Sequence, residues 1–577
     1  LTLLLISCMT LSARAQQRIT SWGDQGNGTY INPILNADYS DPDAIRVGNK
    51  YYMVASDFHF MGMQVLESED LVNWTLISKV YDRIDFPEYE NNERYGGGSW
   101  APALRYHNGK FYVYFCTPEE GLFMSEATDP RGPWTPLHNV VNIAGWEDPC
   151  PFWDEDGKAY LSHGCAGSRA GHKSVLFVAP MSPDGTRLLG QSRIVYDGHE
   201  TQPTIEGTKF YKYNGNYYIF SPAGGVPTGW QVVLKASSPW GPYEERVVMA
   251  QGKSETNGPH QGAWVDTPSG EHWFLHFQDK DAYGRVVHLQ PMTWAADGWP
   301  VIGVDKDGDG VGEPVMKYRK PDLESSGVFQ PAESDDFASV DLGLQWQWHG
   351  VPSPYWYYMD AGARETHTNG LGALRLYSVD QVGGWCNLSD SPNLLLQKTP
   401  ADEFTVTAKL RFIPNPQLKE KGENCGFVLM GQDYATVRLT DTAEGIVLQY
   451  IECKNALKHT EEQVLKTIPM ESAPLPMPYS NTYMSTTVPP VAPLAYVATD
   501  VFIRMEVKPR ERKGNVPDLT AKFFYSLDGK KWTELTENPF VGKPGKWIGA
   551  KFGLYCNRLA SKNDSGWMQA DWVKVSE

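Results

Sequence analysis

The stretch "TQPTIEGTKFYKYNGNYYIFSPAGG", from Thr201 to Gly225, decides the fold. Aromatic and polar residues alternate on both sides of Asn214-Gly215, which predicts two antiparallel strands joined by a tight turn. One carboxylate, Glu206, stands just ahead of the first strand. The remaining residues of the hairpin are suited to burial, so the position of this acid needs an explanation from the rest of the chain.

Four other segments share this layout of a leading polar or aromatic residue, a strand, a turn and a second strand. They are "DPDAIRVGNKYYMVAS" from Asp41, "WAPALRYHNGKFYVYF" from Trp100, "DPCPFWDEDGKAYLSHG" from Asp148 and "HQGAWVDTPSGEHWFLHF" from His260. The segments recur roughly every 50 residues, a period typical of propeller blades. Five repeats therefore predict a five-bladed β-propeller. We expect the five leading residues, Glu206 included, to occupy equivalent places at the start of the inner strands and to converge on one central funnel.

The rest of the chain predicts a second all-β domain. A length of 577 residues exceeds what one core usually organises. Segments such as "EFTVTAKLRF" and "AKFFYSLDGKKWTEL" suit the strands of a β-sandwich. We expect a propeller over 28–315, a linker over 316–334 and a concanavalin-like β-sandwich over 335–577. The Pro-rich stretch 468–493 is expected to form a long loop.

Composition narrows the partners and the location. The net charge of -18 disfavours nucleic acid and anionic membranes, whereas 20 tryptophans offer stacking surfaces to a neutral ligand. The opening "LTLLLISCMTLSARA" predicts a signal peptide over 1–15, and hence an exported bacterial protein of the periplasm or the extracellular space. A lipoprotein signal ending at Cys8 is the less favoured interpretation. No later segment is apolar enough to predict a membrane span, and the oligomeric state stays open.

A funnel that holds several carboxylates suits the cleavage of glycosidic bonds. One carboxyl group must keep a proton for the leaving oxygen, and another must be ionised to activate water or attack carbon. A third acid beside the donor raises the pKa of that donor by repulsion between like charges. Asp41, Asp148 and Glu206 can fill these three roles, and Arg285 on a later strand adds a cation.

The motifs "NPILNADYSDPDAI", "WAPAL", "EDPCPFWDEDGKAYL", "TIEGTKFYK", "NGPHQGAWVD" and "GRVVHLQPM" resemble those of glycoside hydrolase family 43. The resemblance implies an inverting, five-bladed enzyme that cleaves arabinose- and xylose-containing plant glycans. It implies that Asp41 is the general base, Glu206 the general acid and Asp148 the residue that tunes the pKa of the acid. The substrate-binding residues that it implies are Trp100, Phe58, Arg285 and His260, the last of these beside an ion or a water in some members.

Several alternatives stay open at this stage. Asp43 replaces the small residue that relatives often carry, so either aspartate of Asp41-Pro42-Asp43 could face the funnel. The chain could also be a non-catalytic carbohydrate-binding propeller, or a retaining enzyme of the fructan and sucrose type. No cofactor is required for any of these chemistries. The acids Asp305, Asp307 and Asp309 have the spacing of half a calcium loop, but Met316 stands where the bidentate Glu belongs.

Overall fold

The computed structural model describes residues 22–59, 62–86, 89, 94–360, 373–381, 385–418, 421–475, 496–514, 516–559 and 564–576. The predicted signal peptide and most of the predicted Pro-rich loop lie outside these residues. Strands account for nearly all the regular structure that is described. Helix forms only short segments, such as α1 (Gly167–Ala170), η2 (Asp281–Tyr283), η4 (Leu388–Asp390) and η5 (Ala456–Lys458).

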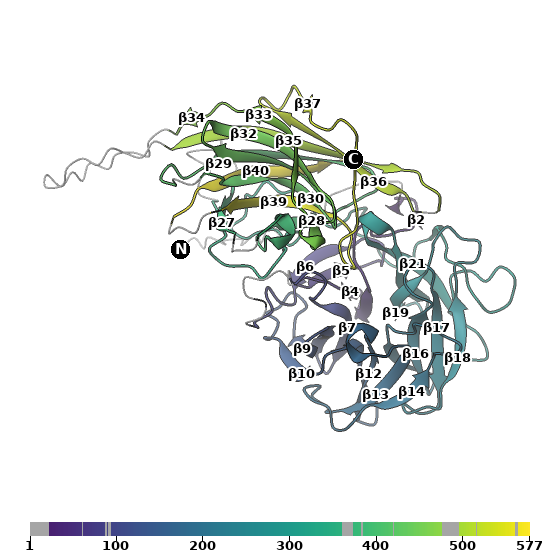
Figure 1. The fold of residues 1–577 in the computed structure, drawn as a ribbon. Helices are drawn as coiled ribbons and strands as arrows, with labels where there is room; N and C mark the ends of the chain where they lie inside the picture. The colour runs from purple at the N-terminus through teal and green to yellow at the C-terminus, as the bar shows by residue number, and fades with distance from the viewer. Residues whose placement is uncertain are drawn as a thin grey trace, which may run out of the picture.

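Five four-stranded antiparallel sheets follow one another along the chain and form the predicted propeller (Figure 1). Blade one contains β3 (Asp43–Val47), β4 (Lys50–Val54), β5 (Gln64–Ser68) and β6 (Thr75–Lys79). Blade two contains β7 (Trp100–His107), β8 (Lys110–Thr117), β9 (Gly121–Ala127) and β10 (His138–Val141). Blade three contains β11 (Trp146–Trp153), β12 (Ala159–Cys165), β13 (Val175–Met181) and β14 (Arg193–Asp197). Blade four contains β15 (Lys209–Tyr213), β16 (Asn216–Ala223), β17 (Trp230–Ala236) and β18 (Glu244–Met249), and blade five contains β19 (His260–Asp266), β20 (His272–Asp279), β21 (Arg285–Trp294) and β22 (Pro300–Ile302).

Each contact between neighbouring blades has its own apolar core. Between blades three and four, for example, buried Val178 meets Ile219 and Val232. Separate clusters fill the other four contacts. A blade buries both of its faces only when it has two neighbours, so the ring must close to complete the last of these cores.

Blade five closes the ring against blade one. Strand β19 contacts β3, and the Arg46 guanidinium donates to both carboxylate oxygens of Asp266 at 3.0 and 2.8 Å. A small sheet of β1 (Gly23–Asp24), β2 (Thr29–Ile31) and β23 (Lys317–Arg319) joins the two ends of the propeller segment. The first part of the predicted linker is therefore a strand held against the propeller.

The second domain is the predicted β-sandwich. One sheet contains β24 (Gln347–Trp348), β27 (Val379–Asp380), β28 (Leu395–Lys398), β30 (Asn424–Met430), β31 (Tyr434–Thr442), β32 (Gly445–Cys453), β33 (Gln463–Pro469) and β39 (Lys551–Arg558). The other contains β25 (Tyr357–Met359), β26 (Leu374–Tyr377), β29 (Phe404–Ile413), β34 (Ala473–Pro474), β35 (Val497–Arg510), β36 (Asp518–Ser526), β37 (Thr533–Glu534), β38 (Phe540–Val541) and β40 (Trp567–Ser576). Both sheets contribute to one apolar core.

The sandwich lies beside the propeller (Figure 1) and contacts it through partly buried polar bonds as well as apolar contacts. Lys280 Nζ of blade five lies 2.5 Å from Asp402 Oδ1, and Tyr283 Oη donates to the Asp402 carbonyl at 2.8 Å. The backbone N–H of Ala550 donates to the Ala282 carbonyl at 2.7 Å. Ala282 and Tyr283 belong to the sandwich core, so the two domains share part of one apolar cluster.

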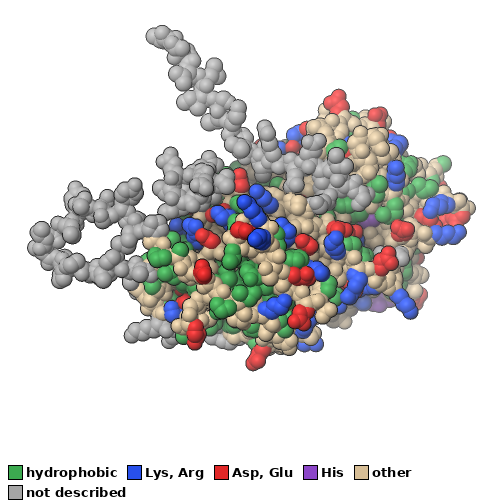
Figure 2. Space-filling view, turned by 90° about the horizontal axis from the view of Figure 1, so that it is seen from above, with side chains coloured by type: hydrophobic (Ala, Val, Ile, Leu, Met, Phe, Trp, Pro, Cys, Tyr) green, Lys and Arg blue, Asp and Glu red, His purple; other side chains and the backbone are tan. Residues whose placement is uncertain are grey.

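The visible surface carries charges of both signs, and the cysteines of the described residues form no disulfide. On the face shown in Figure 2, acidic and basic side chains are interspersed rather than gathered by sign. Seven cysteines fall within the described residues, all are free, and six of them are buried. No helix in the described part of the chain is long and apolar enough to cross a membrane.

Candidate active site

All five blades carry the same one-residue β-bulge at the start of the inner strand. The bulged residue has a positive φ in each case: Asp41 (52°), Ala101 (35°), Asp148 (55°), Gly207 (67°) and Gln261 (34°). The residue before the bulge pairs with the neighbouring strand or its extension, as Ser40 with Ser56, Trp100 with Cys116, Glu147 with Gly164, Glu206 with Pro222, and His260 with Phe277. Bulges of this kind change the direction of side chains beside functional sites.

This register corrects the predicted equivalence of the five leading residues. Asp41 and Asp148 occupy the bulge itself, whereas Trp100, Glu206 and His260 stand one residue before it. Blades one, two and four all have two-residue turns, yet Asp41 lies one residue nearer to its turn than Trp100 and Glu206 lie to theirs. The bulge in blade four requires glycine, because a Cβ at Gly207 would lie 2.6 Å from Gln261 Cγ.

Asp41 is buried, and its carboxylate is fixed from both sides. Ser40 Oγ and Ser56 Oγ donate to Asp41 Oδ2 at 2.9 and 2.5 Å. Arg285 Nη1 lies 3.6 Å from Asp41 Oδ1 and donates to Ser40 Oγ at 2.8 Å. The Ala101 N–H of blade two donates a hydrogen bond to Ser56 Oγ at 2.7 Å. Blades one, two and five therefore orient this one carboxylate together.

Asp43 lies between blades one and two instead of facing the funnel. Its fully buried Oδ2 lies 2.7 Å from Arg105 Nη1 and accepts from the Leu104 N–H at 2.7 Å. Arg105 also contacts Cys150 Sγ at 2.8 Å. Of the two aspartates that the sequence left open, Asp43 is therefore a blade-to-blade ion-pair residue.

Asp148 is anchored by the blades that follow it. Its Oδ2 accepts from the Gly207 N–H at 2.6 Å, and its Oδ1 accepts from Gln261 Nε2 at 3.4 Å. Thr208 Oγ1 donates to the Asp148 carbonyl at 2.7 Å. Because Gly207 follows Glu206 directly, the bond that orients Asp148 also places Glu206 beside it.

Burial and repulsion raise the pKa values of both acids. For Glu206, burial is the largest cause, followed by Asp148 and Asp41, and the pKa rises to about 8 against smaller opposing effects of Arg285 and Lys173. Burial also raises the pKa of Asp148, to about 6, although the hydrogen bond from Gly207 opposes the rise. Near pH 7, Glu206 therefore keeps its proton while Asp148 is largely ionised. The Glu206 side chain is still 23% exposed, so a ligand can reach it.

His260 lies beneath Glu206 as a neutral imidazole. Its Nε2 is 3.3 Å from Glu206 Oε1, and its ring centroid is 5.4 Å from that of Phe277. Complete burial, followed by Arg285 and His276, lowers the pKa of His260 to about 3. His260 therefore borders the acid without adding a charge to the funnel.

Phe58, Trp100 and Arg285 form a wall beside the acids. The Phe58 and Trp100 rings meet edge to face with centroids 6.2 Å apart, and the Arg285 guanidinium carbon lies 5.5 Å from the Phe58 ring. The guanidinium carbon of Arg169 in α1 lies 5.7 Å from the centroid of the Trp100 ring. The same guanidinium donates to Glu119 Oε1 at 3.0 and 2.8 Å. The four predicted substrate-binding residues are thus all in contact with one another or with Asp41 and Glu206.

The sandwich borders a cleft of about 560 Å³ that opens beside Arg285. Its loop 543–549 supplies Trp547, which is 50% exposed and has a φ of 69°. The loop approaches blade five so closely that a Cβ at Gly549 would lie 2.7 Å from Gly284 N. The second domain therefore helps to shape the approach to the funnel.

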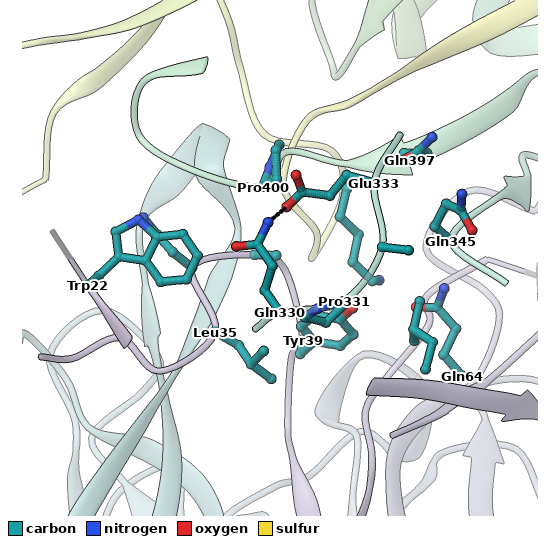
Figure 3. A pocket seen from close by; sticks show the side chains of 15 residues that line it. Trp22, Leu35, Tyr39, Gln64, Gln330, Pro331, Glu333, Gln345, Gln397 and Pro400 are labelled. Carbon is teal, nitrogen blue, oxygen red and sulfur yellow. Dashed lines mark hydrogen bonds between the residues drawn. The ribbon is translucent and has the colours of Figure 1, made fainter. Parts of the chain in front are cut away.

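A second, much smaller cavity of about 40 Å³ lies between the domains, as shown in Figure 3. Trp22, Leu35 and Tyr39 line it from the propeller side, and Gln330 donates to Glu333 in its wall at 2.8 Å. None of the three candidate acids lines this cavity, which has room for little more than a water molecule.

The candidate calcium ligands form a tight turn whose own backbone N–H groups already donate hydrogen bonds to the carboxylates. The carboxylate oxygens of Asp305, Asp307 and Asp309 lie within 4.8 Å of one another, and these three residues are the only such ligand group in the described part of the chain. Asp305 already accepts from the Gly308 and Gly310 N–H groups at 2.7 and 2.9 Å. The ion or water expected beside His260 stays a prediction. Calcium binding at the turn stays a prediction.

Sequence reasoning missed two charged residues of this site, Glu147 and Lys173. Both influence the pKa of a neighbouring group: Glu147 raises that of the Cys165 thiol, and Lys173 lowers that of Glu206. Glu147 was recognisable only as an acid next to Asp148, because its equivalence to Glu206 depends on the bulge. Lys173 follows α1, in a loop outside the repeats, and carried no sequence signal.

Comparisons with known proteins agree with this architecture. Residues 30–300 match the family described as "Glycosyl hydrolases family 43", and residues 334–576 match the "Beta xylosidase C-terminal Concanavalin A-like domain". In fold, the chain resembles a xylan beta-1,4-xylosidase from Bacillus halodurans, with a TM-score of 0.76 and 22% identity over 95% of this chain and 100% of that chain.

Three curated relatives are similar in sequence. A putative beta-xylosidase of Xylanibacter ruminicola is 56% identical over 67% of this chain and 70% of its own length. A beta-xylosidase of Formosa agariphila is 32% identical over 97% of this chain and 92% of its own length. A non-reducing end alpha-L-arabinofuranosidase of Bacteroides ovatus is 32% identical over 70% of this chain and 74% of its own length.

Proposed function

Because the chain belongs to glycosyl hydrolase family 43 and is therefore a glycoside hydrolase, we propose that it releases terminal pentoses from plant cell-wall glycans with inversion. The pentose is β-D-xylose, α-L-arabinofuranose or both. Xylose is the first candidate, because two of the similar relatives carry the name beta-xylosidase. Membership of a hydrolase family argues against a propeller that only binds sugar.

This proposal rests on the protonated state of Glu206. With a pKa of about 8, Glu206 holds a proton near neutral pH and can donate it to the glycosidic oxygen as the bond to the anomeric carbon breaks. Asp41 takes a proton from the water that attacks the opposite face of that carbon. The product is a free pentose with inverted configuration, and the leaving sugar keeps the proton from Glu206.

Three other residues support this chemistry without transferring protons. Asp148, held by Gly207, keeps the pKa of Glu206 high by repulsion. Arg285 orients Asp41 and is placed to hydrogen-bond the terminal sugar. Phe58 and Trp100 offer apolar ring surface to the faces of the sugar.

We further propose that the enzyme acts on chain ends and is exported. The sandwich loop with Trp547 narrows the approach beside Arg285, which favours a short terminal unit over the middle of a long chain. The apolar opening of the sequence supports export to the periplasm or the extracellular space, where plant polysaccharides are met.

A comparison of substrates tests the proposed function. The full chain should hydrolyse nitrophenyl β-D-xyloside or nitrophenyl α-L-arabinofuranoside, shorten xylo-oligosaccharides from one end, and leave sucrose and fructans intact. Activity on fructosyl substrates with none on either pentoside would refute the proposal, as would the release of internal fragments from debranched arabinan or xylan.

A further inference from the structure

Glu147 is a carboxylate of the funnel that the proposed mechanism leaves without a role. It stands immediately before the bulge of blade three, as Glu206 does in blade four and Trp100 does in blade two. In those two blades the residue at this position faces the funnel: Glu206 meets His260, and Trp100 meets Phe58. The same backbone geometry places Glu147 between them in the ring.

The surroundings of Glu147 confirm that it lies close to the acids. The side chain folds over Gly164, whose added Cβ would meet Glu147 Cγ at 3.5 Å and Oε1 at 3.8 Å. Burial, followed by Asp148, Glu206 and Asp41, raises the pKa of Glu147 well above its ordinary value, and Lys173 opposes this rise. Glu147 therefore shares one electrostatic environment with all three acids.

The residues just before Glu147 are tightly packed. The preceding residue, Trp146, stacks on His163 with centroids 3.7 Å apart. Gly145 packs against α1, where an added Cβ would lie 2.8 Å from Ala170 N. The Glu147 side chain is only partly buried, and its carboxyl group has no hydrogen-bond partner within the described residues. A partly exposed carboxyl group without a protein partner can hydrogen-bond water or a bound ligand.

We propose that Glu147 contacts the substrate, and that its carboxyl group hydrogen-bonds a hydroxyl of the sugar on the leaving-group side of the scissile bond. Glu206, at the same position one blade further, donates to the oxygen that this leaving sugar carries. Trp100, one blade earlier, supplies ring surface on the other side of Glu147. A sugar bound at the leaving-group position would thus have a proton donor and a hydroxyl partner on two consecutive blades.

The inference deepens the proposed function and rests on it, so the test must separate the two. Two substrates with the same terminal pentose are compared: a nitrophenyl pentoside, whose leaving group has no sugar hydroxyl, and the matching disaccharide, xylobiose or arabinobiose. The variants are Glu147→Ala and Glu147→Gln. The control is Glu155→Gln, which changes a carboxylate of the same blade whose side chain is 88% exposed, at the opposite end of β11.

We expect Glu147→Ala to lower kcat/KM for the disaccharide about tenfold or more, and to lower it for the nitrophenyl pentoside less than about threefold. Glu147→Gln, which keeps a donor and an acceptor, should lie between Glu147→Ala and the wild type. The control should match the wild type on both substrates. Thermal unfolding of each variant verifies the fold, and the near-isosteric Glu147→Gln keeps the test valid if Glu147→Ala unfolds.

Two outcomes would overturn the inference. Equal losses on both substrates, with a shifted alkaline limb of the pH profile, would mean that Glu147 acts through Glu206 and does not contact the leaving sugar. Unchanged kcat/KM on the disaccharide in both variants would mean that Glu147 makes no such contact. A wild-type enzyme inactive on both substrates would instead refute the proposed function.

Discussion

Replacing Glu206 by Gln should stabilise the folded protein at alkaline pH, although it removes the proposed proton donor. In the folded chain, burial and then repulsion from Asp148 and Asp41 raise the pKa of Glu206 from 4.5 to about 8. In the unfolded chain the pKa stays near its ordinary value. As pH rises between these two values, the unfolded chain loses a proton that the folded chain keeps, so the free energy of unfolding falls. Below the lower value, both states are protonated and the loss vanishes.

The size of the effect follows from the two pKa values. One pKa unit corresponds to about 1.4 kcal/mol, so the rise in the pKa of Glu206 sets an upper bound of about 5 kcal/mol above pH 8. Asp148 can hold the proton in place of Glu206 in the wild type, which reduces the gain. We therefore expect Glu206→Gln to recover about 2 to 3 kcal/mol at pH 8.5 and almost nothing at pH 4.5.

Thermal unfolding of the wild type and of Glu206→Gln at a series of pH values between these limits measures this difference. The midpoint of the variant should exceed that of the wild type by a margin that grows with pH. The exposed Glu155→Gln provides the control, with a margin that stays flat. A margin for Glu206→Gln that does not change with pH, or that becomes negative at pH 8.5, would refute the reasoning.

Three further predictions concern the base, the second domain and the metal. Asp41→Asn should abolish turnover while the protein stays folded. Asp43→Asn breaks the buried pair with Arg105, so it should lower the free energy of unfolding by about 3 kcal/mol and spare the chemistry. Activity and unfolding assays on both variants would reveal the reverse pattern if Asp43 were the base. A fragment ending near Pro321 should be insoluble or much less active, because blade five loses its contacts with the sandwich, and a soluble, fully active propeller would contradict this. Chelation should leave the unfolding midpoint unchanged, because Met316 replaces the bidentate ligand of a calcium loop, and a drop that calcium restores would show that the acidic turn binds the ion.

The repeats made the fold predictable, because each blade must present the same alternation to two neighbours. The hairpins around Gly109 and Gly215 were recognisable for this reason, and they lie where the sequence predicted. The all-β character of the second half followed from the same alternation. The contacts between the domains were not predictable in detail, because they join residues far apart in the chain, as Lys280 and Asp402 do.

The site was predictable in its residue types and less so in its geometry. Asp41, Asp148 and Glu206 stood out because acids recur at the starts of the repeats. In each blade, one bulged residue with a positive φ decides which neighbouring side chain faces the funnel. The position of this bulge cannot be predicted from the alternation of apolar and polar residues along the strands. Glu147 escaped notice for that reason. The burial of Asp43 against Arg105 likewise depends on the packing of two blades.

The anomeric configuration of the first-formed sugar tests the central claim most directly. Proton NMR can follow the hydrolysis of a β-D-xyloside or an α-L-arabinofuranoside from its first minutes, before mutarotation mixes the anomers. With Glu206 as acid and Asp41 as base on opposite sides of the sugar, the first product should have the configuration opposite to that of the substrate. A first product with the substrate's own configuration would require a nucleophile in the funnel and would contradict the account.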